Sequence, residues 1–390
     1  SRQSRGLGDV YKRQVYVHEH GNWALERKGS PGNLQAFEEE MSHGAAGREA
    51  LDSAIIAAVR LGRIGGDGTR LVGCCFVDCC ARMLRNAEFV DDESLSTLES
   101  LMCQQGACEV VIPVELVEAD RARLKHVFDR CELKVTVGTR SSFKGKDSEQ
   151  DLRRLLGVDE LRGRCLATEQ RLSLTAAGGL IKHLELMTAS DSHGLWALEW
   201  TEPNHFMRLD AGALHALSVF PQSGESDRNA SLQGILGKCQ TAAGTRMLRK
   251  WLKQPLITTY DIELRLDLVQ AFATSFQLRS MLRDAVLPSL SAELERICRK
   301  MQGPRGDLQD VYVLYRWVHA LPALLRALHT AEGCTEQEAE LLSSRFVAPL
   351  ERAFGHFLKL LQLVEKAVDL EAVTRHEYLL QPHFDPELVA

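Results

Sequence analysis

The pattern of apolar residues changes once along this chain, and that change restricts the folds that the chain can adopt. Residues 54–138 hold short apolar runs that alternate with amphipathic helical segments, whereas the residues after about 165 are helical in pattern. Alternating strands and helices are typical of a partly parallel sheet that is covered by helices. We therefore expect an α/β domain followed by an all-α domain with long helices.

The α/β part begins with a hairpin signal. Two apolar runs, residues 54–63 and 70–78, flank the turn sequence IGGDGT, which favours a β-hairpin. Two further strands are expected at residues 108–114 and 133–138, and two helices are expected at residues 93–104 and 116–131. The polar stretch 139–151 is expected to be a linker.

The all-α part contains two long amphipathic segments. Residues 308–330 carry apolar side chains at helical spacing, and Pro322 is expected to kink this helix. Thr335 followed by Glu338 predicts a capping box, and an apolar stripe continues from there to about residue 368. A helix at residues 166–187 is expected to open this part of the chain.

Charge and cysteine usage limit the classes of function. The formal net charge of −6 argues against binding nucleic acid through bulk charge, although residues 121–154 hold a local basic excess. The 11 cysteines include two adjacent pairs, Cys74-Cys75 and Cys79-Cys80, whose side chains point to opposite faces of a strand. We interpret them as free thiols of a reducing compartment. No apolar run reaches the roughly 18 residues of a membrane span, so no membrane partner is expected.

One short segment combines a turn, a basic helix and a proline stop. Within TAAGTRMLRKWLKQPL, residues 241–256, a basic stripe at helical spacing offers possible contacts with phosphates or an acidic partner: Arg246, Arg249, Lys250 and Lys253. A solvated face is the simpler interpretation of the same stripe. Trp251 lies on the opposite, apolar face, and if it is buried its replacement by Ala should cost about 3–5 kcal/mol.

Sites for catalysis are sparse in the sequence. A nuclease that binds Mg²⁺ through Asp78, with help from Asp91, Asp92 and Glu93, is one alternative, but the last three suit a helix N-terminus better. The phosphate-loop pattern GxxxxGK[ST] is absent, and the histidines show no metal spacing. We therefore expect no catalytic, cofactor or metal site in this chain.

The segment from residue 241 to 272 resembles the core-domain motif of the MutS family of DNA mismatch-repair proteins. The matching pattern is a threonine, Gly-x-Arg, a Leu-x-x-Trp helix, Pro-Leu, and Ile-x-x-Arg-Leu-x-x-Val. It falls on Thr241, Gly244, Arg246, Leu248, Trp251, Pro255, Leu256, Ile262, Arg265, Leu266 and Val269. Stretches such as KGSPGNLQAFE and HEYLLQPHFDPEL extend the resemblance from about residue 15 to residue 390.

This resemblance implies a domain plan for an internal part of a longer protein. Residues 1–14 have no apolar periodicity and are expected to be an assembly artefact. Residues 15–27 would be the tail of a mismatch-binding domain, and residues 28–160 a connector of ribonuclease-H-like fold. Residues 161–390 would be the first part of a core and lever domain. The motif at 241–269 would then be a structural joint that couples these domains.

The resemblance also implies a function for the longer protein. Such a protein would bind mismatched or looped-out double-stranded DNA in the nucleus, as a heterodimer with a second MutS homologue. It would use ATP and Mg²⁺ and recruit MutL-type proteins, while this chain supplies the allosteric connector and lever. A helical scaffold without ATPase activity is the alternative.

Overall fold

A computed structural model describes the chain in two units. The described residues are 13–19, 22–29, 55–139, 141–143, 145–157, 171–187, 193–222, 227–301, 306–330, 332–373, 375, 377–381 and 384. The first unit comprises residues 1–234 and 250–255, and the second comprises 235–249 and 256–390. Most of the stretch KGSPGNLQAFE, the expected boundary at residue 160 and the last six residues lie outside the described part.

The N-terminal described residues form a hairpin. Strand β1 (Arg13–Glu19) pairs in antiparallel fashion with β2 (Asn22–Gly29). Arg13 and Gln14, which the sequence suggested were part of an artefact, pair with Gly29 and Lys28 in this hairpin. Residues 1–12 of that expected artefact are not described.

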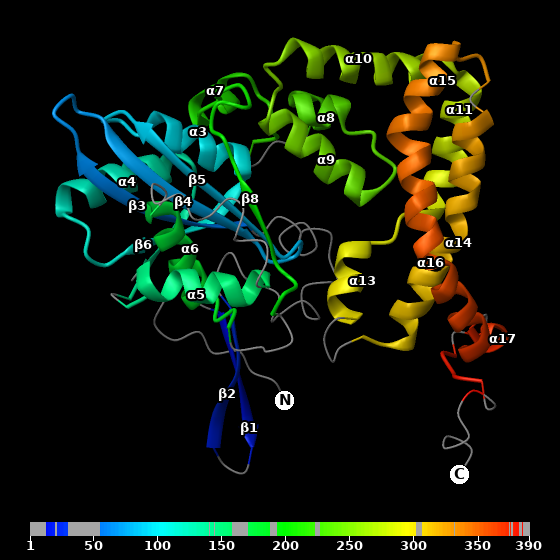
Figure 1. The fold of residues 1–390 in the computed structure, drawn as a ribbon, viewed down its shortest axis with the longest axis horizontal. Helices are drawn as coiled ribbons and strands as arrows, with labels where there is room; N and C mark the ends of the chain where they lie inside the picture. The colour runs from blue at the N-terminus through cyan, green and yellow to red at the C-terminus, as the bar shows by residue number, and fades with distance from the viewer. Residues whose placement is uncertain are drawn as a thin grey trace. The chain divides into compact units, whose positions relative to one another are not determined.

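A six-stranded mixed sheet forms the centre of the first unit, in the order β7-β6-β3-β4-β5-β8 (Figure 1). Its strands are β3 (Ile55–Ile64), β4 (Arg70–Asp78), β5 (Met83–Asp91), β6 (Ala107–Pro113), β7 (Lys134–Gly138) and β8 (Ala197–Trp200). The first three are antiparallel, whereas β6, β7 and β8 join by parallel pairing. The predicted hairpin and the partly parallel sheet are thus confirmed.

Helices cover both faces of this sheet. On one face lie α3 (Ser96–Gln105) and α4 (Glu118–Arg130), and on the other lie α5 (Gly145–Leu156) and α6 (Arg171–His183). Adjacent residues of β4 point to different faces of the sheet: Cys74 packs with α3 and α4, whereas Cys75 packs with α5 and α6. This confirms the opposite orientation expected of Cys74 and Cys75, whereas Cys79 and Cys80 lie in the turn after β4 and not in a strand.

Helix α6 approaches its neighbours closely because glycines line the contacts. A Cβ atom on Gly73 of β4 would lie 2.4 Å from the backbone of Leu172. A Cβ on Gly178 would lie 1.9 Å from the Ser148 hydroxyl of α5, and one on Gly179 would lie 2.6 Å from the Phe143 ring. A larger side chain at Gly73 would displace the α6 backbone, and one at Gly178 or Gly179 would displace the Ser148 or Phe143 side chain.

These elements correct two expectations about the domain boundary. Residues 145–151, expected to be linker, form most of α5, whose Leu152 and Leu155 are buried. Helix α6 was expected to begin the all-α domain, but it packs on the sheet, and β8 pairs with β5 still later in the chain. The α/β unit therefore extends past residue 160, because apolar side chains of α6 complete its core.

Short helices connect this sheet to the second unit. They are α7 (Ala211–Ala216), the 3-10 turn η4 (Arg228–Ala230), α8 (Leu232–Leu236) and α9 (Ala242–Lys253). The division between the two units falls within α8 and again within α9.

The second unit is entirely helical in its described residues. Its elements are α10 (Thr259–Thr274), α11 (Phe276–Met281), the π-turn η5 (Leu282–Val286), α12 (Leu287–Ser289), α13 (Leu294–Met301), α14 (Leu308–Thr330), α15 (Glu336–Leu342), the π-turn η6 (Ser343–Val347), α16 (Ala348–Ala367) and α17 (Leu370–Val373). The long helices α14 and α16 lie side by side (Figure 1) and share a core that includes Val318 and Phe357.

Two predicted details of this unit can be compared with the structure. The capping box is present, since the Thr335 side chain accepts from the Glu338 amide and the Glu338 carboxylate bonds back to the Thr335 amide. Helix α14 has the predicted bounds and continues through Pro322.

A buried ion pair fixes α4 to the sheet and gives a first prediction. Arg70 Nη1 lies 2.6 Å from Asp120 Oδ1, and Arg70 Nη2 donates to the Gly62 carbonyl at 2.8 Å. Replacing Asp120 by Asn should cost about 2–4 kcal/mol of unfolding free energy, because Arg70 is 5% exposed and would lose its counter-charge. Urea denaturation followed by circular dichroism measures this loss.

The same pair sets a pH dependence and offers a control. The hydrogen bond and charge of Arg70 hold the pKa of Asp120 below its usual value, so its contribution is present at neutral pH and is lost as the pH falls through that lowered pKa. The difference in unfolding free energy between the wild type and Asp120→Asn should therefore become smaller below about pH 4. Glu93→Gln, in the exposed pair with Arg123, should cost less than about 0.5 kcal/mol. Equal losses in both variants would contradict this account.

Candidate functional site

Helix α9 carries most of the motif that the sequence singled out. Thr241 precedes the helix, and its hydroxyl accepts a hydrogen bond from the Gly244 amide at 3.1 Å. This satisfies one of the free amides of the first turn, as at other helix N-termini. At its other end the helix stops at Lys253, two residues before Pro255, as predicted.

Arg246 belongs to an ion-pair cluster within the second unit. Its Nη1 atom lies 2.6 Å from Glu293 Oε2, and its Nη2 atom lies 3.6 Å from Glu295 Oε2, at the start of α13. The Arg246 and Glu293 side chains are both about one-quarter exposed. Arg246 thus forms ion pairs within the second unit. The spacing of the basic residues in the sequence did not predict these pairs.

The last residues of the motif join the α/β unit through buried amides. Gln254, 6% exposed, donates from Nε2 to the Gln104 carbonyl of α3 at 3.2 Å. Gln104 in turn donates from Nε2 to the Met207 carbonyl at 3.0 Å, and the Met207 amide donates to the Pro255 carbonyl at 2.9 Å. We call these four residues the Gln104–Gln254 cluster.

The basic stripe of α9 is therefore not one uniform face. Arg246 pairs with glutamates, and Lys253 Nζ lies 5.6 Å from the centre of the Phe220 ring. Arg249 is half-buried, and Lys250 is exposed.

The apolar face of this segment is more exposed than its sequence predicts. Trp251 is 41% exposed and Met247 is 52% exposed, while Leu248 is half-buried. On α10, Ile262 and Leu266 are 36% and 59% exposed, and Arg265 is half-buried. The expectation of a buried Trp251 is wrong for this chain, because the apolar stripe of α9 lacks full cover within the described residues.

The carboxylates proposed for a nuclease do not converge. Asp78 and Asp91 end β4 and β5, which pair in antiparallel fashion with Arg70 opposite Asp91. Eight residues of strand, or about 27 Å, therefore separate the two aspartates. Each carboxylate accepts backbone amides: Asp78 from Cys80 and Ala81, and Asp91 from Asp92, Thr97 and Leu98.

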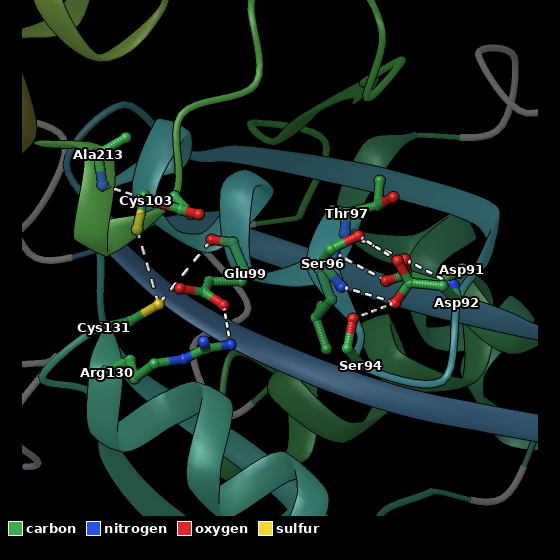
Figure 2. Close-up of polar contacts among 12 residues, drawn as sticks. Asp91, Asp92, Ser94, Ser96, Thr97, Glu99, Cys103, Arg130, Cys131 and Ala213 are labelled. Carbon is green, nitrogen blue, oxygen red and sulfur yellow. Dashed lines mark hydrogen bonds and ion pairs between the residues drawn. The ribbon is translucent and has the colours of Figure 1, made fainter.

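These contacts explain the acidic cluster as helix capping. Asp91 and Asp92 lie at the N-terminus of α3, where Asp92 also accepts from the Ser94 and Ser96 hydroxyls (Figure 2). Burial raises the pKa of Asp92, but hydrogen bonds from Ser96 and Ser94 together outweigh it and hold this pKa below its usual value. In the part of the chain that the structure describes, no three His, Cys, Asp or Glu residues are grouped to hold a metal ion. Asp78 and Asp91 therefore lie too far apart to bind one metal ion together.

The local basic excess at residues 121–154 is also engaged internally. Arg123 pairs with Glu93, Arg130 with Glu99, and Arg153 with Glu149. Arg121 donates to the Val114 carbonyl at 3.0 Å. The interpretation of this region as an ordinary solvated face fits these contacts.

Comparison with known proteins matches both parts of the chain. The family model MutS domain II matches residues 54–194, and MutS domain III matches residues 212–383. DNA mismatch repair protein msh-2 of Neurospora crassa is 33% identical over 372 residues, which cover 94% of this chain and 39% of that protein. DNA mismatch repair protein MSH2 of Arabidopsis thaliana is 32% identical over 381 residues, with 97% and 40% covered. The Saccharomyces cerevisiae MSH2 is 32% identical over 403 residues, with 96% and 41% covered.

The chain thus spans about two-fifths of the length of these relatives. The boundary between the two matched domains falls between residues 194 and 212. This agrees with the placement of β8 at the edge of the first sheet. Among the described residues, every helix is too short or too polar to cross a membrane.

The Arg246 cluster predicts an energetic coupling that a surface contact would not show. Arg246→Ala and Glu293→Gln should each cost about 1–2 kcal/mol, and the double variant should cost about 1 kcal/mol less than their sum. Chemical denaturation of the four proteins measures this double-mutant cycle. Lys250→Ala, on the same helix, is the control and should change stability by less than about 0.5 kcal/mol. Strict additivity would show that Arg246 and Glu293 do not interact.

Partial exposure lowers the expected cost of removing Trp251. Trp251→Ala should now cost about 1–2 kcal/mol, well below the loss expected for a buried tryptophan, because part of the ring is already in water. Urea denaturation checks this value against Phe76→Ala, whose ring is fully buried and whose loss should be about 3–5 kcal/mol. A loss for Trp251→Ala as large as that of Phe76→Ala would mean that the ring is buried in solution.

Proposed function

This chain belongs to the MutS family of DNA mismatch-repair proteins, and we propose that it is the connector and core part of a mismatch-recognition subunit. The observation that carries the proposal is the presence of MutS domains II and III in succession on one chain. The first match lies within the α/β unit, and the second covers most of the helical unit together with residues 212–234 and 250–255 of the first unit.

We assign the ribonuclease-H-like fold to the α/β unit. Its support is the strand order β5-β4-β3-β6-β7, with three consecutive antiparallel strands extended by two parallel ones. The added strand β8 and helix α6 enlarge this framework. We assign the lever to the long helices α14 and α16 of the second unit.

In this proposal α9 and its flanking residues form a rigid joint. Arg246 is held by glutamates within the helical unit, and Gln254 is held by Gln104 within the α/β unit. The two ends of this 12-residue helix thus make their contacts in different units, which supports a coupling role. The role of this chain is thus coupling, with no catalytic residue assigned to it.

The wider activity is proposed for the longer protein to which this chain corresponds. That protein binds mismatched or looped-out double-stranded DNA in the nucleus, pairs with a second MutS homologue, and recruits MutL-type proteins. It uses ATP and Mg²⁺, but the residues described here offer no metal cluster and the sequence has no phosphate loop. No nucleotide step is therefore assigned to this chain.

The first experiment is to obtain the complete transcript and translate it beyond Ala390. We expect a downstream GxxxxGK[ST] motif after a strand, and ATP hydrolysis by the full-length protein that mismatched DNA stimulates. A stop codon without such a motif would contradict the ATP-coupled function and favour a helical scaffold.

The Gln104–Gln254 cluster gives a prediction for the full-length protein. Gln254→Ala should leave mismatch affinity within about twofold but slow ATP-induced release from the mismatch by about tenfold, because the joint loses a buried hydrogen bond worth about 1–2 kcal/mol. Fluorescence anisotropy with a labelled mismatched duplex, before and after ATP, measures both quantities. Gln277→Ala, at an exposed position of α11, is the matched control. Unchanged release in Gln254→Ala would contradict the role of this contact.

A further inference from the structure

Two thiols from separate helices lie in contact in the α/β unit. The Cys103 and Cys131 sulfur atoms are 3.6 Å apart (Figure 2). Cys103 lies in the last turn of α3, and Cys131 is the residue that ends α4. A disulfide bond is about 2.05 Å long, so the sulfurs need to approach by only about 1.5 Å.

The backbone holds both thiols in defined positions. The turn after Cys103 closes at Gly106, whose amide bonds to the Met102 and Cys103 carbonyls. After Cys131 the chain turns at Glu132, with φ +56°, and the Leu133 amide bonds back to the Phe128 carbonyl at 2.9 Å. Both sulfurs thus lie at helix ends that neighbouring hydrogen bonds fix.

Access and charge distinguish this pair from the thiols of the sheet. Cys74 and Cys75 are fully buried on opposite faces of β4, whereas Cys103 and Cys131 are both half-buried. The Glu99 carboxylate nearby is held by Arg130, which limits its repulsion of a thiolate (Figure 2). A small, uncharged oxidant is able to reach sulfurs of this exposure.

The surroundings also shift the pKa values of the two thiols in opposite directions. A hydrogen bond with Cys131 lowers the pKa of Cys103, and the charge of Lys253 acts in the same direction against burial and Glu99. The same hydrogen bond and burial raise the pKa of Cys131. Cys103 is therefore the thiol that loses its proton first.

We propose that Cys103 and Cys131 form an oxidative modification site, at which a hydroperoxide converts the two thiols into an intramolecular disulfide. The proposal rests on the sulfur contact and is independent of the mismatch-repair function.

The reaction balances with hydrogen peroxide as the oxidant. The Cys103 thiolate attacks one peroxide oxygen, the O–O bond breaks, and the departing hydroxide takes up a proton to give water and Cys103 sulfenic acid. The Cys131 sulfur then attacks the Cys103 sulfur, the S–O bond breaks, and a second water leaves with the Cys131 proton. The two thiols lose two electrons and two protons in total, and the peroxide is reduced to two waters.

The cross-link lies beside the buried amides that hold the end of α9. Gln104, which bonds to Gln254 and Met207, is the next residue after Cys103. A bond between Cys103 and Cys131 ties this turn of α3 to the end of α4. Oxidation would thus restrict movement at the Gln104–Gln254 cluster.

The test uses the whole 390-residue chain treated with a small excess of hydrogen peroxide. Remaining thiols are alkylated, the protein is digested without reduction, and peptides are identified by mass spectrometry. We expect a linked Cys103–Cys131 peptide that dithiothreitol removes. The wild type and Cys298→Ser, which lacks an exposed thiol elsewhere, should give it equally. Recovery of both cysteines as alkylated peptides after oxidation, or pairing of Cys103 with several other cysteines, would overturn the proposal.

Single variants test the order of the steps. In Cys131→Ser the sulfenic acid at Cys103 has no partner thiol, so dimedone should label Cys103. In Cys103→Ser, dimedone should label Cys131 at least tenfold less. Circular dichroism spectra that match the wild type show that both variants are folded. Stronger labelling of Cys131 than of Cys103 would overturn the assignment of Cys103 as the attacking thiol.

Discussion

Burial of both faces of strands β3 and β4 is the constraint on which the α/β unit depends. Ile56 and Ala58 face α5 and α6, whereas Ala57 and Val59 face α3 and α4, and all four are fully buried. Each large apolar side chain removed from water contributes about 1.5–3 kcal/mol, so neither face of the sheet is stable without its helices. The glycines at the α6 contacts, the capping of α3 and the Arg70–Asp120 pair all hold those helices against the sheet.

Helices α9 and α10 differ from the helices that cover the sheet, because their apolar residues remain partly exposed. Trp251, Leu266 and Val269 are 41%, 59% and 55% exposed, although their spacing is that of a buried face. The polar residues of this region, by contrast, are well paired, as Arg246 and Gln254 show. The specific geometry of the motif is thus carried by ion pairs and amide contacts more than by a local apolar core.

Sequence reasoning succeeded where the signal was local and failed where it was not. The hairpin of β3 and β4, the α3 stripe and the Thr335 capping box depend on neighbouring residues, and each was predictable. Strand β5 was not, because Arg85, Asn86 and Glu88 interrupt its apolar alternation and its pairing with β4 defines it.

The site shows the same division. The bounds of α9 follow from Thr241 and Pro255, because each residue affects only the helix end within a few residues of it. The partners of Arg246 and Gln254 lie 47 and 150 residues away in sequence, and neither Glu293 nor Gln104 carries a local signal of its role. Contacts of this kind become visible only once the fold has brought the chain segments together.

The position of β8 at the edge of the sheet has a consequence for how the chain folds. Strands β3, β4 and β5 are joined by turns of a few residues, so they can associate early at low entropic cost. Met83 of β5 must wait for Ala197, which arrives 114 residues later in synthesis. Until then the outer edge of β5 offers unpaired amides and carbonyls to any other strand, and intermolecular pairing of nascent chains should concentrate there.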